Sequence, residues 1–180
     1  MLRRLLLLVA LLALVAAGIG AVVVTGRPPV RDARREVDAR WATLRAPLGA
    51  RYTALGQLPT ALTAAGVGDR AAVTELRGSL DQWRALAARG DDPGGEAGTA
   101  NALEGQAARI RADVAASPRL SADAGVTQAF AAFDSAVVPG ADVRAFDAAV
   151  RRYQQVRTSL LKRPAALAFD YGPVPVLVLG

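Results

Sequence analysis

Apolar positions follow two different patterns along this chain. Residues 5–24 form an unbroken run without a charged, amide or hydroxyl side chain. From about residue 30 onward, apolar positions recur every three or four residues with charged residues between them, which is the spacing of amphipathic helices. The chain therefore divides into one wholly apolar segment and a longer body of helices that each bury one face.

The apolar run has the length of a membrane-spanning helix, because its residues in helical form cover roughly 30 Å. A basic flank, residues 1–4, precedes it, and Ala16-Ala17-Gly18 offers a cleavage site for a signal peptide. The run continues past this site to Val24 and is followed by two prolines. This favours an uncleaved transmembrane helix over residues 5–25 and a linker over residues 26–30, with a cleaved signal as the alternative.

Basic residues on both sides of the run bear on its orientation. Five arginines between residues 27 and 40 outnumber the two in residues 1–4. Since basic residues stay on the cytoplasmic side, we expect a single-pass protein of the cell membrane with its body in the cytoplasm. Exported domains also begin with a short basic start before an apolar segment, so the opposite orientation stays open.

Five apolar stripes in the body predict five helices. The first is expected to begin near Val30, to bend at Pro47 and Gly49, to continue past Pro59 and to end at Gly66. The others are expected to start at residues suited to a helix start: Asp69, Thr99, Ser121 and Asp142. The stripes are Val37, Trp41, Leu44, Leu48, Leu55, Leu58 and Leu62; Val73, Leu76, Leu80, Trp83 and Ala87; Leu103, Ala107, Ile110 and Val114; Val126, Phe130, Phe133 and Val137; and Val143, Phe146, Val150, Tyr153 and Leu160.

Amphipathic helices joined by short loops pack most simply as an antiparallel bundle. The predicted fold is therefore all-α, with a transmembrane helix followed by a long-helix bundle over residues 31–171. The larger aromatic residues fall on the stripes, so we expect them in the core. They are Trp41, Trp83, Phe130, Phe133 and Phe146.

Three segments interrupt or follow these helices. Residues 90–95 have the composition of a loop; their adjacent carboxylates, Asp91 and Asp92, indicate a solvated turn rather than a metal site, since no further ligand pattern accompanies them. Pro139-Gly140 predicts a break between two helices rather than one bent rod. The apolar tail, residues 172–180, favours an extended conformation. It either packs onto the bundle or docks on the sheet edge of a partner.

Composition narrows the possible functions. The chain has no His and no Cys, and its 22 basic and 16 acidic side chains give a net charge of +6. These charges are interspersed and aromatic residues are few, so no nucleic-acid groove is indicated. The carboxylates are expected on solvent faces, and no phosphate loop or nucleophile elbow occurs. We therefore predict no enzyme, no catalytic, cofactor-binding or metal-binding residues, and no nucleic-acid partner.

The segment Phe146-Asp147-Ala148-Ala149-Val150-Arg151-Arg152-Tyr153-Gln154 resembles the signature of the LemA family, whose pattern reads roughly Tyr-Asn-x-x-Val-x-x-Tyr-Asn. Further resemblances follow in the family's order: Val37 with Trp41, Leu48 with Arg51-Tyr52, Leu58-Pro59, Ser117-Pro118-Arg119-Leu120, and Pro164 with Leu167 and Phe169. Together they extend from about Val30 to Tyr171. Asp and Gln replace the two Asn of the signature, and Pro139-Gly140 interrupts a helix that is continuous in the family, as in a divergent member.

This resemblance implies a membrane anchor in front of a helical bundle without established enzymatic chemistry. We therefore expect an interaction or scaffold module that contacts the bilayer through residues 5–24 and binds unidentified protein partners or itself. Arg51, Arg151 and Arg152 are expected on a solvated or ion-paired face rather than on lipid headgroups. The alternative is a secreted or envelope-facing helical protein that binds a lipid or a small hydrophobic ligand.

Overall fold

The computed structural model describes the backbone of residues 2–159 and 172–179 and the side chains of residues 28–159 and 172–179. Within these residues the chain is all-α and contains no strand, which confirms the all-α part of the predicted fold. The helices are α1 (Leu2–Leu55), α2 (Leu58–Ala64), α3 (Ala71–Arg89), α4 (Pro93–Ala115), α5 (Pro118–Ser121), α6 (Ala124–Ser135) and α7 (Gly140–Thr158).

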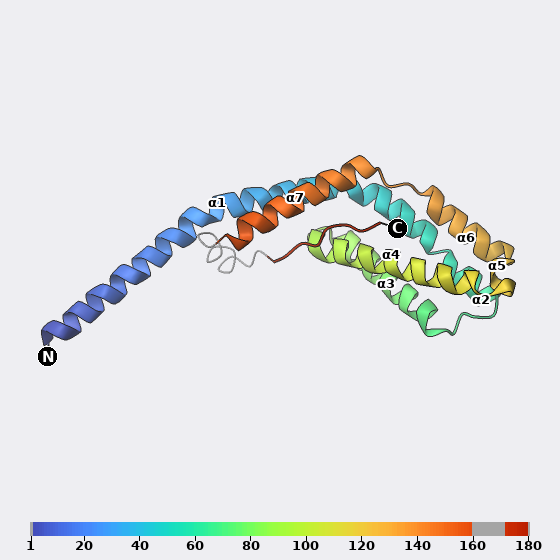
Figure 1. Ribbon diagram of the computed structural model, residues 1–180, viewed down its shortest axis with the longest axis horizontal. Coiled ribbons are helices and arrows are strands. Elements are labelled where there is room, and N and C mark those ends of the chain that lie inside the picture. The colour runs from blue at the N-terminus through green and yellow to red at the C-terminus, as the bar shows by residue number, and fades with distance from the viewer. Residues whose placement is uncertain (1, 160–171, 180) are drawn as a thin grey trace.

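The helices form an elongated bundle around α1, which packs against α7, α6, α4 and α3 (Figure 1). α7 runs antiparallel to α1, and α3 and α4 form an antiparallel hairpin on another side of it. α1 and α4 run in the same direction. Arg45 of α1 contacts Glu96 of α4, and Arg51, further along α1, contacts Glu104, further along α4. The structure therefore confirms a helical bundle, and it combines antiparallel neighbours with one parallel pair.

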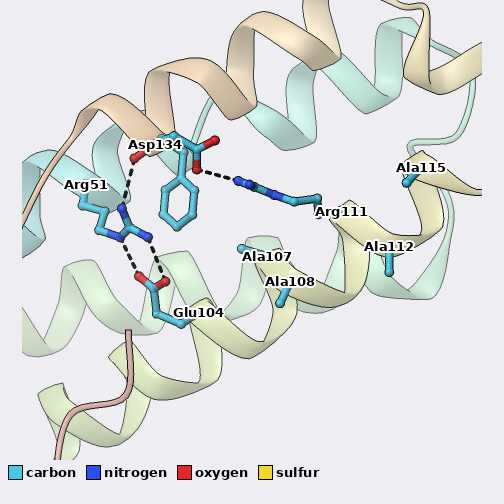
Figure 2. Close-up of a pocket in the computed structure, with 9 residues that line it drawn as sticks. Arg51, Glu104, Ala107, Ala108, Arg111, Ala112, Ala115 and Asp134 are labelled. Atoms are coloured by element: carbon cyan, nitrogen blue, oxygen red, sulfur yellow. Dashed lines mark hydrogen bonds and ion pairs between the residues drawn. The ribbon is translucent and has the colours of Figure 1, made fainter. Parts of the chain in front are cut away.

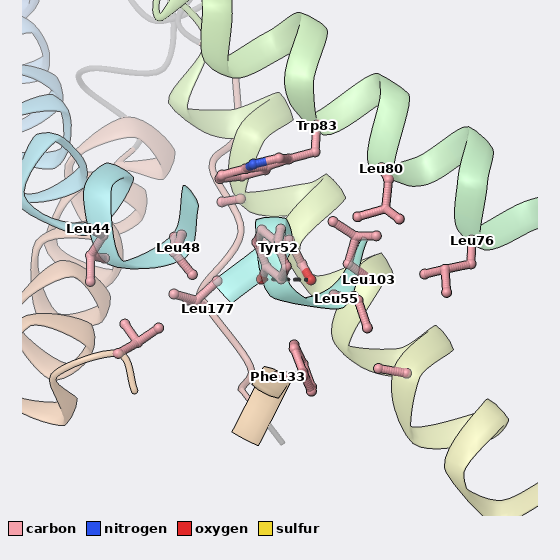
Figure 3. Packing of buried hydrophobic residues seen from close by; sticks show 14 of the residues in the cluster. Leu44, Leu48, Tyr52, Leu55, Leu76, Leu80, Trp83, Leu103, Phe133 and Leu177 are labelled. Carbon is pink, nitrogen blue, oxygen red and sulfur yellow. Dashed lines mark hydrogen bonds between the residues drawn. The ribbon is translucent and has the colours of Figure 1, made fainter. Parts of the chain in front are cut away.

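The predicted stripes form one core. Trp41 lies 5.0 Å from Phe146 and Tyr52 lies 4.8 Å from Trp83, measured between ring centroids. Figure 3 shows part of this core, with side chains from several helices meeting around Tyr52. All five aromatic residues expected in the core are buried: Trp41, Trp83, Phe130, Phe133 and Phe146.

Three stripe positions depart from the prediction. Val137 is 74% exposed, and its neighbour Val138 is buried in its place. Both follow the end of α6, so the helical spacing no longer determines which of them faces the core. Ala87 and Val143 are only partly buried, and Leu160 lies outside the described residues.

The course of α1 corrects two expectations. The helix runs through Pro28 and Pro29, where a linker over residues 26–30 was expected. A proline fixes φ near the helical value; its ring removes a hydrogen bond and crowds the carbonyl four residues earlier, which weakens a helix at that point but does not always end it. α1 then ends at Leu55 and does not continue past Pro59, which lies in the first turn of α2. Its missing amide hydrogen is harmless there, because that position has no helical acceptor.

All four expected helix starts are displaced. α3 and α7 begin after Arg70 and Pro139, which make no side-chain cap, and α6 begins after Asp123 instead of Ser121. The largest error is at α4, which starts at Pro93 rather than Thr99. Asp92 accepts a hydrogen bond from the amide of Gly95 there (2.9 Å), so it caps a helix within the segment expected to be a loop.

The structure also shows how the segments between and after the helices are arranged. The break at Pro139-Gly140 is confirmed, since residues 136–139 separate α6 from α7. The tail, residues 172–179, has no regular secondary structure and packs onto the bundle with Val174 and Leu177 buried. In the part of the chain whose side chains are described, no helix is long and apolar enough to cross a bilayer. The predicted span, residues 5–24, lies outside that part.

Candidate functional site

Two carboxylates on α4 lie inside the bundle, contrary to the expectation that the acidic residues occupy solvent faces. Glu96 is fully buried and Glu104 is 6% exposed. A buried carboxylate is strongly destabilising unless a cation and hydrogen-bond donors compensate it. Both receive this compensation from α1, which supplies Arg45 to one and Arg51 to the other.

Glu96 is held by two side chains of α1, and it is fully buried whereas its partner Arg45 is 33% exposed. Its Oε2 accepts hydrogen bonds from Trp41 Nε1 (2.7 Å) and Arg45 Nε (3.0 Å), and its Oε1 accepts from Arg45 Nη2 (2.9 Å). Arg45 Nη2 also donates to the carbonyl of Gly90, directly after α3. The hydrogen bond to Glu96 raises the pKa of Arg45. This pair therefore ties α1 to both ends of the α3–α4 connection.

Arg51 and Glu104 form the second buried pair. Arg51 Nε and Nη2 donate to the two carboxylate oxygens of Glu104 at 2.7 and 2.9 Å, the bidentate geometry that favours such pairs. Arg51 Nη1 donates to the carbonyls of Phe133 (3.2 Å) and Ala136 (3.3 Å) at the end of α6. The guanidinium also lies 3.8 Å from the centroid of the Phe133 ring. One side chain thus joins α1, α4 and α6, and the hydrogen bond to Glu104 raises the pKa of Arg51.

The structure shows where the three arginines that were expected on a solvated or ion-paired face lie. Arg51 is ion-paired, as expected, but it is buried rather than solvated. Arg152 is exposed and pairs with Glu36 of α1 (3.2 Å), and Arg151 is exposed. Only the last two lie on a solvated face.

A groove opens beside the second pair, between α4 and α6 (Figure 2). Its volume is about 390 Å³, and α4 lines it mainly with small residues. Arg111 and Asp134 meet across it at 2.6 Å and are both half exposed. The lining residues are Arg51, Glu104, Ala107, Ala108, Arg111, Ala112, Ala115, Phe133 and Asp134.

The groove has an apolar wall and charged groups that neutralise each other in pairs. Such a surface suits an apolar side chain or an acyl chain better than an ionic ligand, which would have to displace an existing ion pair. Among the residues whose side chains the structure describes, no three carboxylates converge as metal ligands would. The groove therefore offers a surface for contact with an apolar group.

Sequence reasoning missed the buried pairs although a signal for them exists. Arg51 follows Leu48 by three residues and therefore falls on the predicted stripe of α1. The stripe of α4, extended backwards from Leu103 in steps of three and four, reaches Ala100 and Glu96. Opposite charges on the apolar faces of two helices indicate that the helices pair with each other.

In the segment of residues 146–154, which was compared with the LemA signature, two residues lie in the core and two bind the tail. Phe146 and Tyr153 are fully buried. Asp147 and Gln154, which stand where the family pattern has Asn, form hydrogen bonds with the backbone of the tail at Leu177 and Val174.

Comparison of this chain with protein-family models, with curated proteins and with solved structures finds no match.

Proposed function

We propose that this chain is a non-enzymatic interaction module of the LemA type, held at a membrane by residues 5–24 with its bundle on the cytoplasmic side. The observation that supports it is the continuity of α1. The backbone helix that contains the apolar run is the same helix that supplies Val37, Trp41 and Leu44 to the core. A bundle built around such a helix would be held close to the bilayer in a defined orientation.

The chemistry of the bundle supports the non-enzymatic part of the proposal. The two buried carboxylates, Glu96 and Glu104, are both engaged by arginines that also bind backbone carbonyls. Groups held in this way stabilise the packing of helices and are poorly placed to exchange protons with a substrate. What remains for function is the surface, including the groove between α4 and α6.

Extraction of membranes with alkaline carbonate tests the anchor. We expect the full-length chain to stay in the membrane, because residues 5–24 match the thickness of the hydrocarbon core. Leu12→Arg places a charge near the middle of the run, which costs about 2.5–3.5 kcal/mol on insertion scales, and should release the protein. Leu12→Ile is the matched control and should be retained. Release of the unmodified chain would refute the anchor.

The groove supports a second candidate, the binding of a lipid or small hydrophobic ligand by an exported protein. Its volume of about 390 Å³ lies within the range of small-molecule pockets. A fluorescent fatty acid should then bind the purified chain, and Ala108→Trp in the groove should block it while Ala102→Trp, exposed elsewhere on α4, should not. A mature N-terminus after Gly18 would favour this candidate over the anchored module.

A further inference from the structure

Charged residues divide unevenly between two parts of the bundle. Residues 58–135, which contain α2 to α6, carry seven basic and ten acidic side chains. Residues 27–45 of α1 and 144–157 of α7 together carry ten arginines and four acidic side chains. The bundle is therefore basic where α1 directly follows the apolar run and where α7 accompanies it, and acidic overall in the remaining helices.

α7 adds a second row of arginines beside the row on α1. Arg152 pairs with Glu36 of α1 (3.2 Å), although 116 positions separate the two residues. Because α7 runs antiparallel to α1, its last residues lie beside the part of α1 that precedes Glu36 (Figure 1). Arg31 and Arg35 therefore lie at the same end of the bundle as Arg151 and Arg152, and we call these four residues the basic end.

The basic end is exposed, and its ion pairs are weak. Arg35 is 67% exposed and Arg152 is 70% exposed. Arg31 and Arg35 share one partner, Asp32, at 3.8 and 3.9 Å, which is long for an ion pair. Exposed pairs of this kind contribute little to stability. Another anion can therefore replace the existing partners at little cost.

With residues 5–24 across the bilayer, the basic end lies near the level of the lipid headgroups. The backbone of α1 is one continuous helix, so Arg31 and Arg35 follow Val24 by about 10 and about 16 Å along its axis. The headgroup layer occupies about 5–8 Å on each side of the hydrocarbon core, and the attraction of an anionic surface extends about 8–10 Å beyond it. Both arginines of α1 therefore lie within reach of an anionic surface.

The arginines of α7 approach the same surface when α1 is tilted. Arg152 lies beside Glu36, about 18 Å from Val24 along α1. Transmembrane helices are tilted by about 20° on average and packed helix axes lie about 8–10 Å apart, so a tilt toward α7 lowers its arginines by about 3 Å. An acidic protein would also suit this charge, but the position directly after the apolar run favours anionic lipids.

We propose that the basic end binds the headgroups of anionic phospholipids, so that the bundle rests against the bilayer with α7 toward the lipid and the α3–α4 hairpin away from it. This deepens the proposed function, on which it rests, by naming the partner of one surface of the module. It also revises the expectation that Arg151 and Arg152 avoid lipid headgroups, because the antiparallel packing of α7 brings them beside the part of α1 that follows the apolar run.

Energy transfer in lipid nanodiscs tests this contact with the full-length chain. The sequence contains no Cys, so Gln155→Cys on α7 can carry a single donor fluorophore, and Gln82→Cys on α3 carries it in the control; both positions are exposed. The discs hold an acceptor-labelled lipid in phosphatidylcholine, with or without phosphatidylglycerol. Transfer from position 155 should be higher in the anionic discs, and this gain should vanish in 1 M salt, where the Debye length is about 3 Å. Transfer from position 82 should not rise.

A fourfold variant of the basic end shows whether these arginines cause the gain. Each arginine near an anionic surface favours contact about fivefold, so the gain at position 155 should be lost in the chain that combines Arg31→Gln, Arg35→Gln, Arg151→Gln and Arg152→Gln. The matched control removes the same charge from exposed positions on and beside α3 and α4 and should keep the gain. It combines Arg70→Gln, Arg84→Gln, Arg89→Gln and Arg109→Gln.

Each result separates the headgroup contact from the anchor. A chain that co-purifies with both kinds of disc but shows equal transfer from position 155 in them would overturn the contact and keep the anchor. A chain that binds only anionic discs, through the basic end, would refute the anchor and keep the contact. Binding to neither disc would overturn both, and loss of the gain in both fourfold variants would overturn the assignment to the basic end. If a variant fails to fold, the comparison of positions 155 and 82 in the two discs decides.

Discussion

At the scale of single residues, the two ion pairs that engage the buried carboxylates Glu96 and Glu104 determine how α1 and α4 align. Apolar stripes with heptad-like spacing can slip by one repeat and still bury apolar surface. Such a slip would leave Glu96 and Glu104 buried without their partners, which is far more costly than the loss of a few apolar contacts. The partners Arg45 and Arg51 are spaced differently on α1 than the two glutamates are on α4, so only one alignment satisfies both pairs.

Removal of Glu104 tests this role. Glu104→Leu leaves the buried guanidinium of Arg51 without its counter-ion, so we expect the free energy of unfolding to fall by about 3–5 kcal/mol. Asp134→Ala breaks the half-exposed pair with Arg111 in the same groove and should cost about 0.2–1 kcal/mol. Urea unfolding followed by circular dichroism measures both. Equal losses would show that burial does not distinguish the two pairs.

Tyr52 predicts a dependence of stability on alkaline pH. Burial raises the pKa of its hydroxyl above the usual value, and Tyr52 Oη donates to the carbonyl of Ala100 (3.3 Å). Above about pH 10 the unfolded state loses this proton while the folded state keeps it, so stability is present below pH 10 and declines above it. Tyr52→Phe should flatten the decline by up to about 1.4 kcal/mol per pH unit, as measured by unfolding at pH 9 to 11. An unchanged slope would contradict the assignment.

At the scale of elements, the break between α6 and α7 is specified from two sides. Pro139 lacks an amide hydrogen and precedes the first residue of α7. Arg51 reaches from α1 to the carbonyls of Phe133 and Ala136, which helix continuation would otherwise use. The local signal is readable in the sequence, whereas the contribution of Arg51 depends on tertiary structure.

Replacement of the proline separates these two causes. In Pro139→Ala we expect residues 136–139 to remain non-helical, because Arg51 still occupies the carbonyls at the end of α6. Secondary ¹³Cα shifts of these residues give the result directly. In Arg51→Met combined with Pro139→Ala the helical shifts should extend further into the segment. Uninterrupted helical shifts in Pro139→Ala alone would show that the proline is the sole cause.

The elements also show how far sequence reasoning reaches. Stripes in the middle of helices were predicted well, since period and burial depend on the same geometry. Starts were predicted poorly: the three glycines of residues 90–95 suggested a loop, but Gly94 and Gly95 lie against Asp92 and the tail, where a Cβ atom would crowd its neighbours. The buried glutamates were missed because acidic residues are mostly exposed, and only pairing of two helices reveals the exception.

At the scale of the whole molecule, α1 is the central helix of the bundle and the tail completes the core. α1 contacts α3, α4, α6 and α7, and the tail is bound by side chains of α4 and α7. The sequence left two possibilities for the tail, packing or docking elsewhere, because an apolar extended segment suits both. The structure answers by burying Val174 and Leu177 in the same cluster as Leu48 and Tyr52.

Substitution of neighbouring tail residues measures how much the tail contributes to stability. Leu177 belongs to the core and Figure 3 shows it among the side chains around Tyr52, so Leu177→Ala should lower the free energy of unfolding by about 2–5 kcal/mol. Val178 is 63% exposed, and Val178→Ala should change it by less than about 0.5 kcal/mol. Both are measured by urea unfolding of the full chain at one fixed protein concentration. A tail that contributes nothing to the core would leave both variants as stable as the parent chain.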